Sequence, residues 1–442
     1  MKRIYLIFTI LLMILLSISC MKEDDENTIR YLNFKPEIAG VYEEIANVYE
    51  EETGVKLIVE TAASGSYEST LQARMSTSDA PTIFQINGPV GYKSWKNYCA
   101  DLTDSELYKH LTDKDLAIKA DGKVYGIPYV VEGYGIIYNK EITDAYFNSS
   151  WKNTSYKSMD EVNNFTKFKE VVEDMQANKD KLGINGVFAS TSLKTGEDWR
   201  WQTHLANIPI SYEFTNNNVD LNSDAYKEVS FQYSENYKNI FDLYLENSVT
   251  NKTQLGTFTV SDSMSEFALG KCVMVQNGNW GAGQILNVNG NKVKEENIKF
   301  MPIYTNMEGE ETQGLSIGTE NFICVNSKAS EEKQKLAKDF LYWLYSSEKG
   351  KNYVVNKLGF IAPFDTFTES DAPKDPLAKE VVSWMNKENI DNIAWNFTLF
   401  PSQNFKESFG GDLLKYAQGK TNWDTVVNNF KTNWKNEWKL VG

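Results

Sequence analysis

The segment from residue 29 to residue 59 constrains the fold of this chain more than any other part of its sequence. Residues 29–34 (IRYLNF) have the apolar and aromatic composition of a β-strand, and residues 55–59 (VKLIV) predict a second strand. Between them, residues 42–53 carry apolar and aromatic side chains at helical spacing among five glutamates, and Gly54 is suited to end such a helix. A strand–helix–strand unit of about 30 residues implies a parallel sheet.

The same alternation of strands and helices continues along the chain and predicts an α/β fold. The length of 442 residues is enough for two domains with substantial cores. The further predicted strands are residues 82–86, 124–128, 130–139, 273–275, 297–303 and 321–325, and the predicted helices are residues 69–75, 165–177, 234–245 and much of the sequence after 330.

Residues 1–19 have the order of a secretory signal peptide, with two cations, an apolar run at residues 4–16 and then small residues. The run is shorter than the about 20 residues that span a bilayer. Cys20 follows directly, and the arrangement resembles a bacterial lipobox, although Ser17 stands where a lipobox usually has Leu. The resemblance implies a lipid anchor on Cys20, a flexible tether over residues 20–28, and a position on the extracytoplasmic face of the bacterial cell membrane. Plain secretion and a retained membrane anchor are the alternatives.

The composition argues against several functions. A formal net charge of −15 does not suit nucleic acid or anionic lipid as the main partner, because both require a basic surface. With only two histidines, His110 and His204, a histidine-based metal site or a Ser-His-Asp triad is not expected. We therefore expect no metal, no cofactor and no catalytic residues. Once Cys20 is lipidated, Cys99, Cys272 and Cys324 are expected to be small buried residues.

Aromatic residues are abundant, with 11 Trp, 24 Tyr and 23 Phe. Trp280 lies in the turn NGNWG after the predicted strand at 273–275, and ligands of open α/β sheets bind beyond the carboxyl ends of the strands. Trp199 and Trp201 flank one residue, so in an extended loop one of them would point inward and the other toward a cleft. Trp395 belongs to a third aromatic cluster. For each of these residues, a place in the core is the alternative interpretation.

Two glutamates stand in otherwise apolar surroundings. Glu132 lies inside the extended run at 130–139, and Glu320 directly precedes the strand predicted at 321–325. A carboxylate in such a place is costly unless it is hydrogen-bonded or faces a water-filled cleft. Both residues are therefore better candidates for a binding site than the many glutamates on predicted surfaces.

The order and spacing of several motifs resemble those of an extracellular solute-binding protein of a carbohydrate ABC transporter, similar to maltose-binding protein. The resemblance covers essentially the whole mature chain. The motifs that carry it are residues 33–60, the APTIFQ sequence at 80–85, YGIPY at 125–129 with EG at 132–133 and IYNK at 137–140, Asn279-Trp280, and Glu320-Asn321 leading into Val325-Asn326.

The resemblance implies a two-lobe periplasmic-binding-protein-like fold in which a hinge joins discontinuous lobes. The first lobe would comprise residues 29–131 and about 303–323, and the second residues 132–302 and about 324–442. The protein would be a monomer that captures a mono- or oligosaccharide in the cleft between the lobes and delivers it to ABC transporter permease subunits. It would not be an enzyme.

The resemblance also implies a set of ligand-binding residues. The first lobe would contribute the loop around Glu37 and the segments near positions 64–67 and 85–88. Glu132 falls where the family hydrogen-bonds sugar hydroxyls, and Trp280 falls where an aromatic ring stacks on the pyranose. The full predicted set is Glu37, Tyr67, Asn87, Glu132, Trp199, Trp201, Trp280, Glu320 and Trp395.

Two other functions stay open at the level of the sequence. A cell-surface glycoside hydrolase would need a pair of carboxylates, and the many acidic residues single out no pair. A binding protein for a peptide or a polyamine would use the same fold. The aromatic content favours a sugar, because an indole can cover the apolar face of a pyranose while polar groups bind its hydroxyls.

Overall fold

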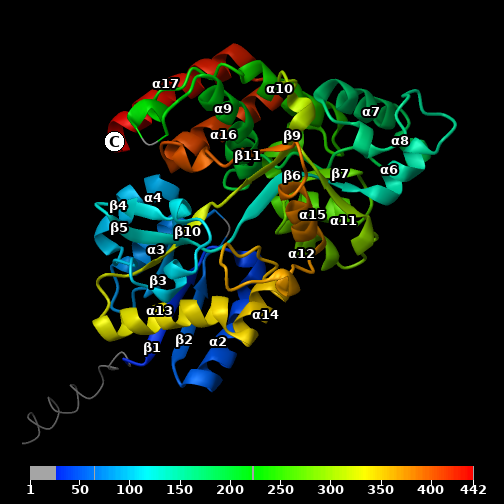
Figure 1. Ribbon diagram of the computed structural model, residues 1–442. Coiled ribbons are helices and arrows are strands. Elements are labelled where there is room, and N and C mark those ends of the chain that lie inside the picture. The colour runs from blue at the N-terminus through cyan, green and yellow to red at the C-terminus, as the bar shows by residue number, and fades with distance from the viewer. Residues whose placement is uncertain (1–25, 64, 222, 442) are drawn as a thin grey trace, which may run out of the picture.

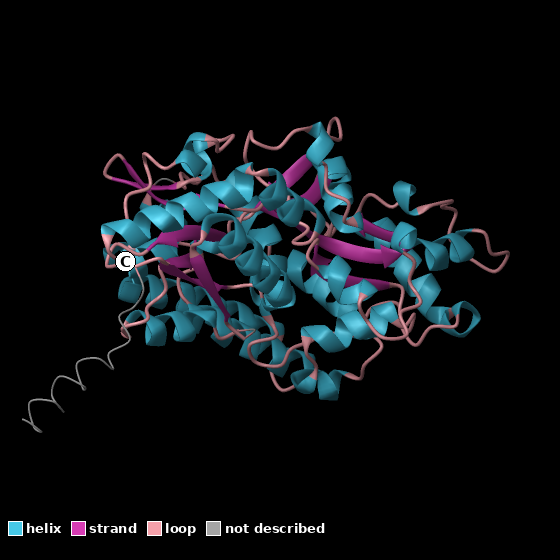
Figure 2. Cartoon of the chain, turned by 90° about the horizontal axis from the view of Figure 1, so that it is seen from below, coloured by secondary structure: helices cyan, strands magenta, loops and turns pink. Residues whose placement is uncertain are grey.

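The computed structural model describes residues 26–63, 65–221 and 223–441. The predicted signal peptide, Cys20 and most of the predicted tether lie outside the described residues. Among those described, no helix has the length and apolarity required to cross a membrane. The chain forms two lobes, each with strands inside and helices around them (Figures 1 and 2).

The first lobe, in the lower half of Figure 1, is built on a six-stranded sheet. The predicted strand–helix–strand unit forms one edge of this sheet, where β1 pairs in parallel with β2 and with β3. β10 is antiparallel to both β3 and β5. In spatial order, the strands are β2 (Lys56–Thr61), β1 (Thr28–Asn33), β3 (Ile83–Asn87), β10 (Asn321–Val325), β5 (Lys123–Pro128) and β4 (Ile118–Ala120).

The helices of the first lobe cover this sheet. α2 buries Tyr42, Ile45 and Tyr49 against it and ends at Gly54, whose φ of 74° is left-handed, as a glycine allows. The helix predicted from the spacing of these apolar residues is therefore confirmed. The helices of this lobe are α2 (Ala39–Thr53), α3 (Tyr67–Met75), α4 (Gly88–Trp95), α5 (Glu106–Lys109), α13 (Glu331–Ser346) and α14 (Glu348–Asn356).

The second lobe holds a five-stranded sheet in which β6 is central. β6 is buried along its whole length and pairs in an antiparallel sense with β7, β8 and β9. The strands are β11 (Asp391–Ala394), β9 (Gln313–Gly318), β6 (Glu132–Asn139), β7 (Met274–Gly278) and β8 (Ile298–Met301).

Helices of the second lobe enclose this sheet and form a large aromatic core. One of its turns, Arg200–Leu205, is a π-helix that leads directly into α9. The helices are α6 (Lys140–Phe147), α7 (Phe165–Ala177), α8 (Lys179–Leu182), α9 (Ala206–Asn216), α10 (Ser234–Asn247), α11 (Val260–Ala268), α12 (Gly281–Leu286), α15 (Pro376–Met385), α16 (Gln403–Ala417) and α17 (Trp423–Val441).

The predicted division into two discontinuous lobes needs correction in its C-terminal half. We assigned residues 303–323 to the first lobe, yet β9 pairs with β6 and β11 in the second. We assigned residues 324–442 to the second lobe, yet β10 and the apolar face of α13, with Phe340 and Leu344, pack in the core of the first. The chain therefore passes between the lobes around residues 129–131, around 319–320, and again between α14 and α15.

The three cysteines in the described part of the chain are small buried residues, as the sequence predicted. Cys99, Cys272 and Cys324 are buried and free of disulfide bonds. Cys99 and Cys324 pack in one apolar cluster of the first lobe, whereas Cys272 packs in the second. They act as small apolar core residues.

Candidate functional site

An ion pair joins the two lobes where the first chain crossing enters β6. Lys35 lies on the loop after β1, and Glu132 is the first residue of β6. Lys35 Nζ donates to Glu132 Oε1 at 2.6 Å, and the two side chains are only 6% and 2% exposed. Asn33 holds the loop, because its amide bonds the carbonyl of Lys35 at 2.7 Å and its carbonyl oxygen accepts from the Lys35 N–H at 3.1 Å.

More carboxylates lie beside this pair than one lysine can neutralise. Burial would lower the pKa of Lys35, but the charges of Glu132 and Glu37 raise it above its ordinary value. Part of Glu37 is exposed to solvent. Desolvation by the surrounding protein nevertheless raises the pKa of its carboxyl, and the charge of Lys35 opposes that shift. The site therefore combines one buried cation with carboxylates that are short of positive charge.

Glu320 completes the acidic group from the second chain crossing. Its Oε1 accepts a hydrogen bond of 3.2 Å from the amide of Asn87, at the end of β3. Burial raises the pKa of Glu320 to about 7, while the charges of Lys35 and Lys406 pull it down. Lys406 belongs to α16, so the carboxyl of Glu320 is influenced by cations from both lobes. A carboxyl of this kind changes charge near neutral pH.

Aromatic side chains of the second lobe form a wall next to the ion pair. Trp280 lies two residues after the end of β7, Trp199 directly precedes the π-helix, and both are half-buried. Their ring centroids are 5.9 Å apart, and the ring of Tyr134 from β6 lies 6.4 Å from Trp199 and 6.3 Å from Trp280. Lys35 Nζ lies 5.1 Å from the centre of the Trp280 ring, so the aromatic wall and the charged group adjoin.

Glycines at the ends of two strands make room for the indoles. A Cβ on Gly278, the last residue of β7, would lie 2.1 Å from Trp280 Cζ3. A Cβ on Gly318, the last residue of β9, would lie 2.6 Å from Trp395 Cβ. Trp395 is 7% exposed and meets Trp280 edge-on at 6.4 Å. The two strands therefore end in positions over which an indole ring can lie flat.

His204 belongs to this cluster, and sequence reasoning missed it. It is 3% exposed, and its ring lies between 4.4 and 5.8 Å from five aromatic rings. Burial lowers the pKa of His204 to about 3, so the imidazole is neutral at physiological pH. The π-helix brings His204 to 5.0 Å from Trp199, five residues earlier, and ordinary helical spacing gives no signal for such a pair.

Two of the predicted ligand residues lie elsewhere. Trp201 is 1% exposed and packs against Phe241 and Tyr244, with its Nε1 donating to the Ser192 carbonyl at 3.2 Å. It is a core residue of the second lobe, whereas Trp199 is half-buried, so the two tryptophans point to different sides as expected, although the chain is helical here and not extended. Tyr67 is 7% exposed, and its hydroxyl accepts from the Gln85 N–H at 2.7 Å inside the first lobe. The other predicted residues lie at the junction of the lobes.

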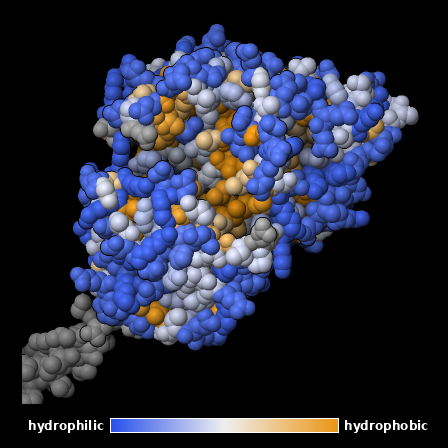
Figure 3. Space-filling view, in the orientation of Figure 1, coloured by the Kyte–Doolittle hydropathy of each residue, from blue (hydrophilic) through white to orange (hydrophobic). Residues whose placement is uncertain are grey.

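The lobes also touch at the mouth of this region. A Cβ on Gly65 would lie 3.0 Å from the carbonyl oxygen of Gly196, and one on Gly88 would lie 2.7 Å from Thr398 Cβ. Gly65 and Gly88 belong to the first lobe, and their neighbours to the second. Figure 3 shows the groove between the lobes, with apolar residues gathered along it. The contacts indicate lobes that lie close together around the aromatic wall.

The family model for bacterial extracellular solute-binding proteins matches residues 44–380, which is more than half of the chain. The chain belongs to this family. Its members are binding proteins, and the extracellular character of the family indicates a position outside the cytoplasm. The resemblance stated from the sequence is confirmed at this level.

Solved structures share the fold of this solute-binding protein. A chitin oligosaccharide binding protein matches with a TM-score of 0.68 at 16% identity, covering 93% of this chain and 98% of its own. RafE in complex with raffinose matches with a TM-score of 0.67 at 17% identity, covering 93% of this chain and 99% of its own. A Bacillus licheniformis sugar transporter protein in complex with stachyose matches with a TM-score of 0.66 at 17% identity, covering 93% of this chain and 100% of its own. At such identities the likeness concerns the fold. No curated protein sequence matches the chain.

Proposed function

We propose that this solute-binding protein captures a mono- or oligosaccharide between its lobes and delivers it to an ABC importer. The observation that carries the proposal is the position of Trp280, half-buried and 5.1 Å from the ammonium of Lys35, which is itself bonded to Glu132. A pyranose has an apolar C–H face and a rim of hydroxyls. An indole can cover the face while a carboxylate and an ammonium bind the rim.

The ligand would contact both lobes. From the first lobe we propose Glu37 and Asn87, and from the chain crossings Glu132 and Glu320. Trp199, Trp280 and Trp395 would form the aromatic side in the second lobe. These groups act by stacking and hydrogen bonding, and the proposed function requires no metal, no cofactor and no nucleophile from them. The raffinose, stachyose and chitin oligosaccharide named for structures of the same fold support a sugar as the ligand.

Delivery would depend on the relative position of the lobes. A ligand that contacts both lobes favours the closed arrangement by the difference between its affinities for the closed and open states. A transporter that recognises the closed surface then receives only loaded protein. We propose permease subunits of a carbohydrate importer as the partner of that surface, with the binding protein acting as a monomer.

We also propose that a signal peptide over residues 1–19 is removed and that a lipid on Cys20 holds the protein at the extracytoplasmic face of the membrane. One experiment tests this point. The full-length protein and its Cys20→Ser variant are expressed in a bacterium that processes lipoproteins, and the membrane and soluble fractions are compared. The wild type is expected in the membrane fraction and the variant outside it. Membrane association of both would contradict the lipid anchor.

Binding is tested with tag-free protein that starts after Cys20. A thermal-shift screen of raffinose, stachyose, maltose and chitin oligosaccharides, followed by calorimetry, should give saturable binding to at least one of them. The same screen contains a polyamine and a dipeptide, because the excess of carboxylates at the site would also suit an amine. Binding of the amine or the peptide alone would refute the sugar proposal. Release of smaller sugars during incubation would indicate a glycoside hydrolase instead.

A further inference from the structure

Two buried ring nitrogens, on neighbouring side chains that both lie beside Trp280, have no hydrogen-bond partner in the described part of the chain. They are His204 Nε2, on the π-helix, and Trp395 Nε1, directly after β11. The side chains are 3% and 7% exposed, and their rings meet edge to face with centroids 5.4 Å apart. A buried polar group without a hydrogen-bond partner destabilises the folded protein. Two such groups, on rings that neighbour each other and Trp280, therefore point to a polar group of the ligand that pairs with both.

The neighbours of His204 determine which of its nitrogens carries the proton. The Thr203 hydroxyl donates its only hydrogen to the carbonyl of Trp199, with an oxygen–oxygen distance of 2.6 Å. Thr203 Oγ1 lies 3.1 Å from His204 Nδ1 and can then only accept, so Nδ1 must be the donor. Because the ring is neutral, Nε2 is left as a bare acceptor. The indole Nε1 of Trp395 can only donate.

An acceptor and a donor on neighbouring rings suit a hydroxyl, which can donate to one group and accept from the other. We propose that one hydroxyl of the bound sugar donates to His204 Nε2 and accepts from Trp395 Nε1. This inference rests on the proposed function and adds a subsite to it. The centroids of both rings also lie 5.8 and 6.4 Å from that of Trp280, so the subsite adjoins the indole that would cover the pyranose face.

The subsite has a consequence for specificity. A sugar that lacks this hydroxyl, or carries a methyl ether in its place, leaves both ring nitrogens unpaired in a dry aromatic pocket. Sites of this type reject such analogues strongly, because the protein groups lose their partners. His204 and Trp395 would thus select for a free hydroxyl, while Trp199 and Trp280 supply area without regard to substitution.

The test uses variants that keep each ring and remove its nitrogen function. His204→Phe, Trp395→Phe and the double variant are titrated by calorimetry with raffinose, stachyose and maltose. For the sugar that binds the wild type, each single variant should bind about tenfold more weakly. The double variant should be close to the single variants rather than a hundredfold weaker, because both groups hold one hydroxyl. Unchanged affinity in either single variant, or fully additive losses, would overturn the shared subsite.

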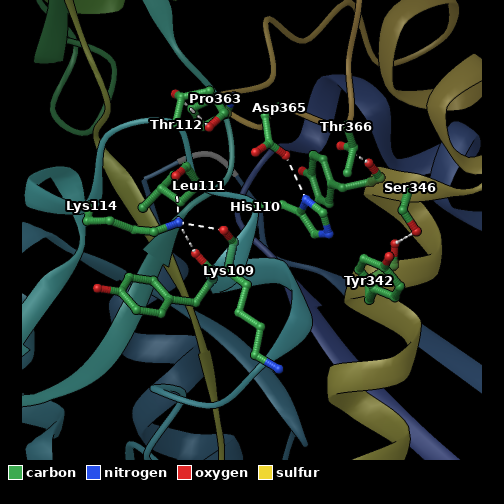
Figure 4. Close-up of polar contacts among 12 residues, drawn as sticks. Lys109, His110, Leu111, Thr112, Lys114, Tyr342, Ser346, Pro363, Asp365 and Thr366 are labelled. Atoms are coloured by element: carbon green, nitrogen blue, oxygen red, sulfur yellow. Dashed lines mark hydrogen bonds and ion pairs between the residues drawn. The ribbon is translucent and has the colours of Figure 1, made fainter.

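The other histidine provides the matched control. His110 lies on the first lobe, where its Nδ1 is 2.6 Å from Asp365 Oδ1 and its ring stacks on Tyr342 (Figure 4). His110→Phe should bind the sugar as the wild type does. Tag-free His110→Phe protein also contains a single histidine, so nitrogen-15 NMR reports on His204 alone. The spectrum should show the Nδ1–H tautomer, and saturation with the sugar should shift the Nε2 signal.

The NMR measurement keeps the proposal testable even where His204→Phe does not fold. An Nε2 signal that is unmoved at saturation would mean that a buried water or nothing occupies this place, and would overturn the subsite while sugar binding stands. Failure of the wild type to bind any of the three sugars would overturn the proposed function and the subsite together.

Discussion

Lys35 Nζ lies 2.6 Å from Glu132 Oε1, and this single contact ties the loop after β1 in the first lobe to the start of β6, the central strand of the second. Both groups are buried, so their attraction acts in surroundings of low dielectric constant and must offset the cost of removing them from water. The same ammonium faces the Trp280 ring at 5.1 Å. The ion pair thus positions a cation between the acidic group and the aromatic wall.

Removing one partner of this pair should be more harmful than removing both. In Glu132→Gln the buried lysine loses its counter-ion, and the free energy of unfolding should fall by about 3 kcal/mol. Sugar affinity should fall about tenfold. Lys35→Met should destabilise similarly, because it leaves Glu132 unpaired. The double variant should regain much of the stability in urea denaturation. Stability losses that simply add would show that the two residues do not depend on each other.

The local parts of this architecture could be predicted from the sequence, and the assembly of the lobes could not. α2 and α7 were predicted because their apolar faces repeat at helical spacing, and Glu132 stood out because a carboxylate interrupts an apolar strand. The amphipathic pattern of α13 predicts a helix but does not say which sheet its apolar face will cover. The segment was therefore assigned to the wrong lobe.

The candidate site was predicted in part for similar reasons. Trp280 comes two residues after the end of β7, and such a position beyond a strand predicts a place at the cleft, with a core position as the alternative. His204 was missed because a π-helix, which no local signal announces, brings it beside Trp199. Both Trp199 and Trp201 were included in the ligand set through the family resemblance, and the spacing of the two residues does not say which of them points inward. The resemblance places Lys35 on the first cleft loop, but its ion pair was not predicted, since the partner lies 97 positions away in the chain.

The close contact between Gly278 and the Trp280 ring predicts that a larger residue at position 278 weakens sugar binding. Gly278→Ala places a Cβ where the indole lies, 2.1 Å from Cζ3, so the ring must move. Its effect on sugar binding should resemble that of Trp280→Ala, a loss of about 1 kcal/mol or more with a small change in melting temperature. The two changes together should cost no more than Trp280→Ala alone, because the displaced ring is then absent.

Gly283→Ala is the control for this substitution. It lies one turn further along, on α12, where a Cβ would meet only Asn287 Nδ2 at an ordinary distance of 3.6 Å. Calorimetry should give wild-type affinity for Gly283→Ala and reduced affinity for Gly278→Ala. Equal affinity in the two glycine variants would remove the Trp280 ring from the binding surface.

Glu320 should make the stability of the ligand-free protein depend on pH. Burial raises its pKa to about 7 in the folded protein, against an ordinary value of 4.5. Between these values the folded state holds a proton that the unfolded state has lost, so the contribution of Glu320 to stability decreases as pH rises from about 4.5 through 7. Glu320→Gln carries no charge at any pH. It should therefore melt at a higher temperature than the wild type at pH 8, and the difference should vanish near pH 4.

Differential scanning fluorimetry across this pH range checks the prediction. Glu43→Gln, an exposed change on α2, serves as the control and should follow the wild-type curve. A Glu320→Gln variant that is less stable than the wild type at pH 8 would mean that Glu320 is held as a favourable carboxylate, with Lys35 and Lys406 outweighing its burial.

The contact between α4 and α17 should influence the balance between open and closed lobes. Lys93 Nζ of the first lobe lies 5.2 Å from the centre of the Trp438 ring in the second. Lys93 is exposed, and partial burial lowers the pKa of its ammonium, with the charge of Lys227 adding to the shift. A contact that exists only when the lobes meet favours closure by its own free energy, about 0.5–1 kcal/mol for a cation over an aromatic ring.

Lys93→Ala should therefore bind the sugar about two- to fivefold more weakly and show a larger radius of gyration by X-ray scattering without sugar. Lys227 provides a matched control, because it lies 5.5 Å from the same ring but belongs to the second lobe itself. Lys227→Ala removes a cation from Trp438 without removing a contact between the lobes, so affinity and radius should stay at the wild-type values. Equal losses in both variants would mean that Trp438 needs a cation for local packing, and that the contact between α4 and α17 has no part in closure.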